Sequence, residues 1–250
     1  MFGDIIGEPG INTLARVLAR LKKQYKPDFV IANGENAADG SPEPNAPLEA
    51  LLDIGVDCVT GGNHTFDRSG AEKTLERKIG VIRPENLKVN AGEGVYIYRH
   101  RKLGIAVINL LGNVFMGKSG HPFLVADEIL SKLDPDLIKI VDFHAEATSE
   151  KIAFSHYFDG RISVIYGTHT HVQTADEKIL EKGTGYITDV GMTGPKDSVI
   201  GVAKELAIKR FLTGDPVKFR PADGECQVNA VFAEIDCETH HTTYIERINF

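Results

Sequence analysis

The chain has 250 residues, of which 42% are hydrophobic and 25% are charged, as in an ordinary water-soluble globular protein. Its net charge of −7 argues against a broad basic surface for nucleic acid. Three widely spaced cysteines, Cys58, Cys226 and Cys237, give neither a disulfide framework nor a thiolate zinc site, and no apolar run is long enough to span a membrane. A cytoplasmic protein without a membrane partner is therefore expected.

The first half of the chain alternates strand, polar turn and helix. Apolar residues from Leu14 to Tyr25 recur at helical spacing, and Asn12 or Thr13 is expected to cap that helix. Short β-rich runs at 28–32 and 56–60 each end in a glycine-containing turn, with helices expected at 46–54 and 69–79. This succession predicts an α/β sheet with right-handed crossovers.

The second half continues the same pattern and ends in a hairpin. Strands are predicted at 94–98, 103–111, 137–143, 162–166 and 186–188, and helices at 124–133, 149–158 and 199–211. The alternation from Cys226 to Glu234, with a partner run at 243–249, predicts the terminal hairpin. We therefore expect one domain over residues 1–250, of α/β class, built as a four-layer α/β/β/α sandwich.

Candidate metal ligands follow the predicted strands at one edge. They are Asp4, the turn 33–36 with Glu35 and Asn36, the turn 61–64 with Asn63 and His64, then His144, and finally His169 and His171. Ligands bind at the carboxyl ends of the strands in open α/β sheets, so these groups are expected to converge. A turn preceded by Gly167 is expected to bring both histidines of the last pair to this edge.

The ligand set indicates two ions and phosphoester chemistry. Imidazole, carboxylate and amide oxygen without thiolate suit Fe, Mn or Zn. The candidates outnumber what one ion needs, which favours a pair of ions joined by a carboxylate, an arrangement suited to phosphoester hydrolysis.

The ordered motifs carry a family resemblance. The series Asp4, Gly34-Glu35-Asn36, Gly62-Asn63-His64, His144 and Gly167-Thr168-His169-Thr170-His171 resembles the calcineurin-like metallophosphoesterases. The segments 31–38 and 188–194 resemble the bacterial YmdB-type branch more closely. Ile6 and Glu35 stand where the wider family has histidine and aspartate, and both departures are those of this branch.

The resemblance implies a role for each residue. Asp4 and His171 would hold one ion with Asn36 as an additional ligand, and Asn63, His144 and His169 would hold the other. Glu35 would bridge the two ions, and His64 would protonate the leaving oxygen. The implied activity is hydrolysis of 2′,3′-cyclic nucleotides or related phosphodiesters by a metal-bound hydroxide, with iron or manganese, in a homo-oligomer that is a dimer or a tetramer.

Two alternative functions and one question about the start of the chain stay open at this point. A mononuclear iron oxygenase would use two histidines and one carboxylate but would leave Asn63 and the third histidine without a purpose. A regulatory protein could use the same site as a metal or nucleotide sensor and act through an RNA-processing partner. The branch also has a few more residues ahead of Asp4, so either the start of the chain is misassigned or the first strand is weakened.

Overall fold

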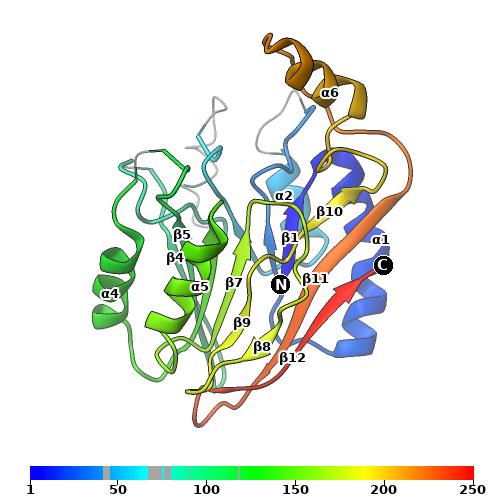
Figure 1. Cartoon of the computed structure of the whole chain (residues 1–250). Coiled ribbons are helices and arrows are strands. Elements are labelled where there is room, and N and C mark those ends of the chain that lie inside the picture. The colour runs from blue at the N-terminus through cyan, green and yellow to red at the C-terminus, as the bar shows by residue number, and fades with distance from the viewer. Residues whose placement is uncertain (42–45, 67–74, 76–79, 90, 118) are drawn as a thin grey trace.

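A computed structural model describes residues 1–41, 46–66, 75, 80–89, 91–117 and 119–250. Within these ranges the strands are β1 (Phe2–Ile5), β2 (Ile31–Asn33), β3 (Cys58–Thr60), β4 (Val95–His100), β5 (Leu103–Leu111), β6 (Ile138–His144), β7 (Val164–Thr168), β8 (Lys178–Ile179), β9 (Gly185–Ile187), β10 (Met192–Pro195), β11 (Cys226–Ile235) and β12 (Thr242–Asn249). The helices are α1 (Gly7–Tyr25), α2 (Ala46–Asp53), α4 (Pro122–Lys132), α5 (Thr148–Tyr157) and α6 (Lys204–Thr213) (Figure 1).

The strands form two six-stranded sheets of mixed direction. The first has the order β12-β11-β10-β1-β2-β3 and the second has the order β4-β5-β6-β7-β9-β8. In the first sheet, β10, β1, β2 and β3 are parallel, and in the second, β5, β6, β7 and β9 are parallel. Antiparallel strands complete both sheets, including the expected hairpin of β11 and β12. Both sheets therefore present the carboxyl ends of parallel strands where a site can form.

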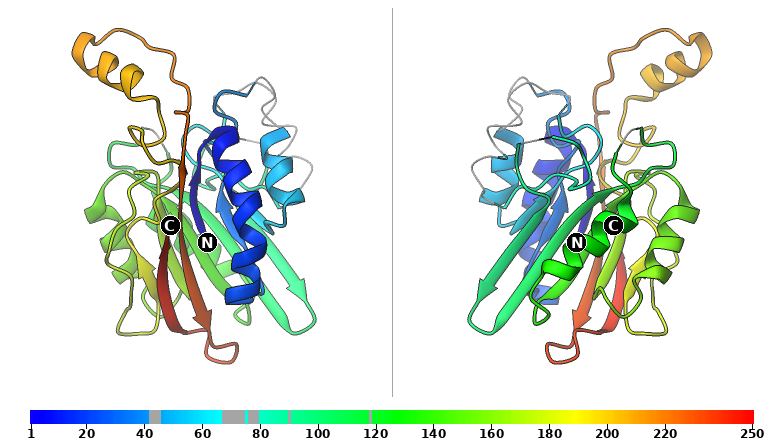
Figure 2. Two further views of the ribbon diagram at one scale, coloured as in Figure 1. Left: turned by 90° about the vertical axis from the view of Figure 1, so that its right-hand side faces the viewer. Right: turned by 90° about the vertical axis from the view of Figure 1, so that its left-hand side faces the viewer.

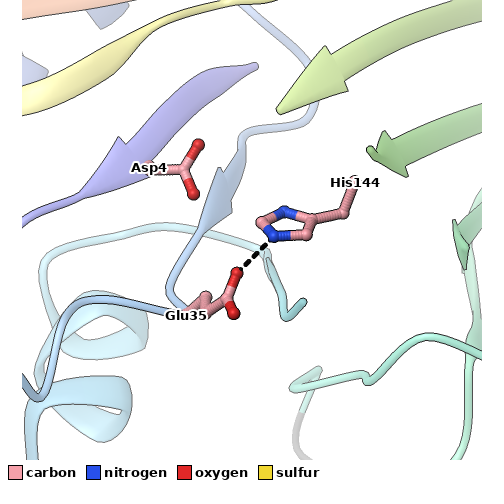
Figure 3. Close-up of side chains that lie close together, drawn as sticks. All are labelled: Asp4, Glu35 and His144. Atoms are coloured by element: carbon pink, nitrogen blue, oxygen red, sulfur yellow. Dashed lines mark ion pairs between the residues drawn. The ribbon is translucent and has the colours of Figure 1, made fainter. Parts of the chain in front are cut away.

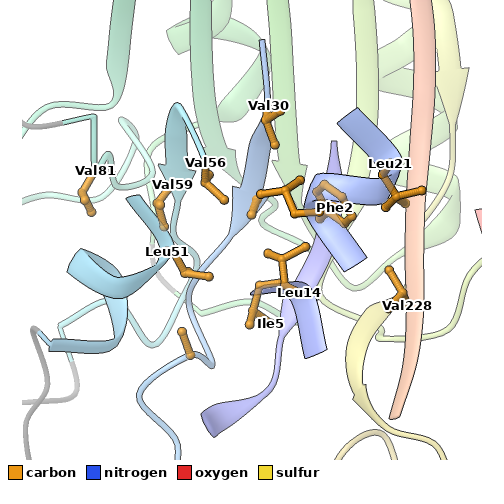
Figure 4. Packing of buried hydrophobic residues seen from close by; sticks show 14 of the residues in the cluster. Phe2, Ile5, Leu14, Leu21, Val30, Leu51, Val56, Val59, Val81 and Val228 are labelled. Atoms are coloured by element: carbon orange, nitrogen blue, oxygen red, sulfur yellow. The ribbon is translucent and has the colours of Figure 1, made fainter. Parts of the chain in front are cut away.

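Helices α1 and α2 cover the outer face of the first sheet, and α4 and α5 cover that of the second (Figures 1 and 2). Apolar side chains fill the boundaries between the layers. On the first sheet Leu14 of α1 packs in one buried cluster with Ile5 (Figure 4). On the second sheet Phe154 of α5 stacks on Phe143 with ring centroids 4.4 Å apart. Between the sheets Ile31 lies in a buried cluster with residues of β5, β6 and β7. The expected α/β/β/α sandwich is confirmed.

Two predicted helix starts are wrong. Helix α1 begins at Gly7 rather than near Leu14, so Asn12 and Thr13 lie inside it and do not cap it. The φ of +54° at Gly7 lets β1 turn directly into the helix, and the Gly7 N–H donates to the carbonyl of Asn36 instead of to a capping side chain.

The last helix, α6, starts later than predicted, at Lys204 instead of 199. Val199 and Val202 pair with each other across a tight turn formed by Ile200 and Gly201, both with positive φ, and a helix cannot include that turn. The helix expected at 69–79 lies outside the described residues, apart from Leu75. In the part of the chain that the structure describes, we find no helix with the length and apolarity needed to cross a membrane.

A buried ion pair attaches α5 to the second sheet. The ammonium group of Lys151 donates to Asp189 Oδ2 at 2.7 Å and to the carbonyl of Thr168 at 2.9 Å. Both side chains of the pair are only 1% exposed. Removal of one partner would therefore leave a buried charge without compensation.

We expect Lys151→Met to lower the free energy of unfolding by about 3–5 kcal/mol, since Asp189 would remain buried without its cation. Equilibrium urea denaturation of metal-free protein measures this change. The matched control is Lys204→Met, whose partner Asp197 lies 2.6 Å away on the surface. The control should cost at most about 1 kcal/mol. Equal denaturation midpoints for the two variants would contradict the assigned role of Lys151.

Candidate metal centre

Side chains from both sheets meet at the carboxyl ends of their strands. Asp4 lies in β1, Glu35 in the turn after β2, and His144 is the last residue of β6. One ligand atom of each lies within 4.8 Å of the others. Figure 3 shows Asp4 and Glu35 on one side of this group and the His144 ring approaching from the other. Asp4 and His144 were expected just after their strands, but Asp4 lies inside β1 and His144 is the last residue of β6.

The Nε2 atom of His144 is the centre of a compact donor group. It lies 2.6 Å from Glu35 Oε2, 3.1 Å from Asn63 Oδ1 and 3.1 Å from His169 Nδ1. Ligand atoms around one ion with bonds of about 2.0–2.2 Å are separated by similar distances. These four side chains are therefore placed as the ligands of one ion would be.

A second group forms around Asp4. Its Oδ1 lies 3.5 Å from Nε2 of His171, and its Oδ2 accepts a hydrogen bond of 3.1 Å from the backbone N–H of His169. Asp4 Oδ1 and Glu35 Oε2 are buried and, apart from their ion pairs with His171 and His144, have no hydrogen-bond partner among the described residues. Buried carboxylate oxygens without hydrogen-bond donors are costly unless a cation binds them, so both atoms fit a metal site.

The three histidines share one hydrogen-bonding arrangement. Nδ1 of His144 lies 3.0 Å from Thr168 Oγ1, Nε2 of His169 lies 3.1 Å from Glu146 Oε2, and Nδ1 of His171 lies 2.7 Å from the carbonyl of Ile200. In each ring the other nitrogen faces the donor groups. A metal-binding histidine is held in this way, with its outer N–H donated to an acceptor and its inner lone pair directed at the ion.

The turn that carries the last two histidines differs from the prediction. Gly167 lies inside β7, where an added Cβ would meet the carbonyl oxygen of Thr188 at 1.8 Å, so glycine is needed there for close strand packing. His169 and His171 themselves adopt positive φ values of +99° and +64°. Asp189 supports this strained backbone by accepting the N–H of Thr170 at 3.1 Å.

The buried charges shift the acidities of the group in opposite directions. Burial alone would lower the pKa of His171, but Asp4 outweighs burial and raises it to about 9. Burial and the neighbouring His144 lower the pKa of His169 to about 4. Burial opposes ionisation of Asp4 and Glu35, yet His171 beside Asp4 and His144 beside Glu35 keep the pKa of both carboxyls below the usual range. Without metal, the group therefore holds its carboxylates ionised.

The two remaining predicted residues, Asn36 and His64, are positioned by hydrogen bonds of their backbones. Asn36 lies beside β1, where its carbonyl accepts the N–H of Gly7, and its side chain forms no hydrogen bond among the described residues. His64 is exposed, and its backbone N–H donates a short hydrogen bond to Glu35 Oε1. The assignment of each side chain to a particular ion stays a prediction.

Glu146 and Thr168 were not predicted from the sequence. Both orient histidines, and both lie within two residues of a predicted ligand, one after His144 and the other before His169. That proximity was a usable signal for Glu146, which is a carboxylate in the turn after a predicted strand. Thr168 gave no signal because a threonine at a strand end is common.

Comparison with known proteins identifies relatives of the chain. A family model described as "YmdB-like protein" matches residues 1–248. The Bacillus subtilis (strain 168) protein named 2′,3′-cyclic-nucleotide 2′-phosphodiesterase is 44% identical over 250 residues, which cover 98% of this chain and 94% of that protein.

Two crystal structures are similar over the whole chain. A hypothetical protein from Thermus thermophilus has a TM-score of 0.92 at 38% identity and is covered to 97%. A phosphatase from Mycoplasma pneumoniae has a TM-score of 0.93 at 40% identity and is covered to 91%. All of this chain is aligned in both cases. The names of these relatives confirm the expected enzyme class, a hydrolase of phosphate esters, and the chain belongs to the YmdB-like family.

Proposed function

We propose that this protein is a metal-dependent phosphodiesterase that hydrolyses 2′,3′-cyclic nucleotides at a site for two ions. The observation that carries the proposal is the shared orientation of the three histidines. Each directs one ring nitrogen toward the other donor groups and has the other nitrogen held by an acceptor outside them. The B. subtilis relative, named for a 2′,3′-cyclic-nucleotide activity, supports the choice of substrate.

The two donor groups support a division between two ions. Asn63, His144 and His169 would hold one ion. Asp4 and His171 would hold the other, with Asn36 as an additional ligand from the neighbouring turn. Glu35 would bridge the two, since its carboxylate is adjacent to His144 and belongs to the same 4.8 Å group as Asp4. Nitrogen and oxygen donors of this kind suit Fe or Mn, and also Zn.

The residues divide the chemistry of phosphodiester cleavage among them. Bound ions supply a water activated for attack and positive charge beside the phosphate oxygens. Asp4 and Glu35 supply the negative charge that retains the ions. The loop that holds Asn63 also carries His64, which we assign to protonate the ribose oxygen that leaves when the cyclic ester opens. The backbone N–H of His64 donates to Glu35 Oε1, so the loop that carries His64 is held at the carboxylate that we assign as the bridge.

We expect Glu35→Gln to lose at least one of two bound metal ions, because the amide removes the bridging negative charge. Elemental analysis of anaerobically purified protein gives the metal content per chain. Glu181→Gln, at an exposed position, is the control and should retain the wild-type content. Two ions retained in Glu35→Gln would exclude Glu35 as the bridge.

We expect His64→Ala to retain its metal but to hydrolyse 2′,3′-cyclic AMP about 10²–10⁴-fold more slowly, as loss of a general acid typically does. The substitution keeps the backbone N–H that holds Glu35. Rates on 2′,3′-cyclic AMP and on bis-p-nitrophenyl phosphate, with metal content from the same preparation, measure the effect. His100→Ala, an exposed histidine at the end of β4, should leave both values unchanged. Wild-type turnover by His64→Ala would remove His64 from the mechanism.

A further inference from the structure

A buried carboxylate that the proposed mechanism does not use lies directly behind the metal centre. Asp142 is fully buried and lies two residues before His144 in β6. Side chains alternate along a strand, so the two residues face the same side, the space between the sheets. The described residues that donate hydrogen bonds to the Asp142 carboxylate are all neutral: Thr168, Thr60 and Asn33. A buried carboxylate without a directly bonded cation is costly, and its presence calls for a physical explanation.

The hydrogen bonds of Thr168 determine which nitrogen of His144 carries the proton. Thr168 Oγ1 lies 2.6 Å from Asp142 Oδ1 and 3.0 Å from His144 Nδ1. The Thr168 hydroxyl has one hydrogen, which it donates to Asp142 Oδ1. Its oxygen is then placed to accept from His144 Nδ1. In a neutral His144 ring with its hydrogen on Nδ1, Nε2 has its lone pair facing Glu35 and Asn63.

The same carboxylate also connects the turns that carry the other ligands. Asn33 donates to Asp142 Oδ2 at 3.1 Å and to the carbonyl of Gly61 at 3.1 Å, and its own Oδ1 accepts the backbone N–H of Glu35 at 3.1 Å. Thr60, which directly precedes Gly61, donates its hydroxyl to the same oxygen of Asp142. Asp142 on the second sheet is thus bonded to the bases of two ligand turns on the first.

We propose that Asp142 is a positioning residue of the metal centre, whose carboxylate acts through the Thr168 hydroxyl to keep the Nε2 lone pair of His144 directed at the bound ion. The inference rests on the proposed function, because it assumes that His144 is a metal ligand. Asp142 itself touches neither metal nor substrate in this assignment. Its effect is on metal affinity, and outer-shell partners of this kind typically change that affinity about 10–100-fold.

Two substitutions at Thr168 test the proposal. Thr168→Val removes the hydroxyl at nearly constant shape, and Thr168→Ser keeps it. We expect the dissociation constant for Mn²⁺, measured by calorimetric titration of metal-depleted protein, to rise about 10–100-fold in Thr168→Val and to return close to the wild-type value in Thr168→Ser. Equal affinities in wild type and Thr168→Val would overturn the proposal, and so would equal weakening by Val and Ser.

A matched control separates metal positioning from general stability. Thr242 is buried at the start of β12, and its hydroxyl donates to the carbonyl of Ser163 at 2.7 Å. Thr242→Val also deletes a buried hydrogen bond and should leave Mn²⁺ affinity unchanged. A comparable loss of Mn²⁺ affinity in this control would show a general effect of stability and would overturn the proposal.

Asp142→Asn provides a second route if Thr168→Val does not fold. The amide keeps the shape of the side chain but adds N–H donors. These donors would face Asn33, Thr60 and Thr168, whose side chains already donate hydrogen bonds to Asp142. We expect the same weakening of Mn²⁺ binding, and wild-type affinity in Asp142→Asn would overturn the proposal. Wild-type protein that binds no Mn²⁺, Fe²⁺ or Zn²⁺ would instead contradict the proposed function, so the two failures are distinguishable.

Discussion

The burial of carboxylates between two sheets is the constraint on which the metal centre depends. The side chains of Asp4 and Glu35 are 0% and 1% exposed, and they share one small space. Two anions at this separation repel each other, and removal from water makes each of them costly. The available counter-charges are imidazoles: His171 beside Asp4 and His144 beside Glu35 favour the ionised carboxyls, whereas burial and His144 disfavour His169 as a cation. Divalent ions would replace these protons, because they would satisfy the carboxylates and accept the lone pairs of the neutral histidines together.

The centre is assembled from two sheets, so it depends on how they pack. In the first sheet Asp4 lies in β1, and Glu35 and Asn63 follow β2 and β3. In the second sheet His144 ends β6, and His169 and His171 follow β7. The buried apolar cluster around Ile31 holds the sheets together beneath the site. At the top of this interface the packing changes from apolar to polar, where Asn33 bonds to Asp142 across the gap. Apolar burial supplies most of the association, and the polar contacts align the two halves.

The sequence predicted most of the elements, and it identified most of the side chains that the structure brings together, because both depend on local patterns. Apolar runs ended by glycine-containing turns located the strands, and the order of Asp4, Glu35, Asn63, His144, His169 and His171 was typical of one family. Partners distant in the sequence could not be predicted. Asn33 and Asp142 are 109 residues apart, and an isolated aspartate in the run Ile138–His144 gives no sign of the partner that it will meet.

Predictions from local sequence rules also failed at positions where tertiary contacts determine the backbone conformation. Residues before a helix usually need a polar cap, yet α1 starts without one because the backbone of Asn36 accepts the Gly7 N–H. Positive φ is uncommon for histidine, and the sequence therefore favoured glycine as the turning residue, whereas His169 and His171 carry that strain. Such exceptions concentrate at functional sites, where surrounding structure can maintain a costly local conformation.

The strained histidine turn indicates that the protein, rather than the metal, sets the ligand geometry. Each positive-φ histidine costs of order 1–3 kcal/mol, which neighbouring contacts must offset for the turn to persist. Asp189 holds the turn by accepting the N–H groups of Thr170 and Gly191, and Lys151 neutralises Asp189 while donating to the carbonyl of Thr168. None of these groups is a predicted metal ligand. The turn is therefore held by contacts other than the predicted ligand groups, so that ion binding would not have to include the whole free energy of ordering it.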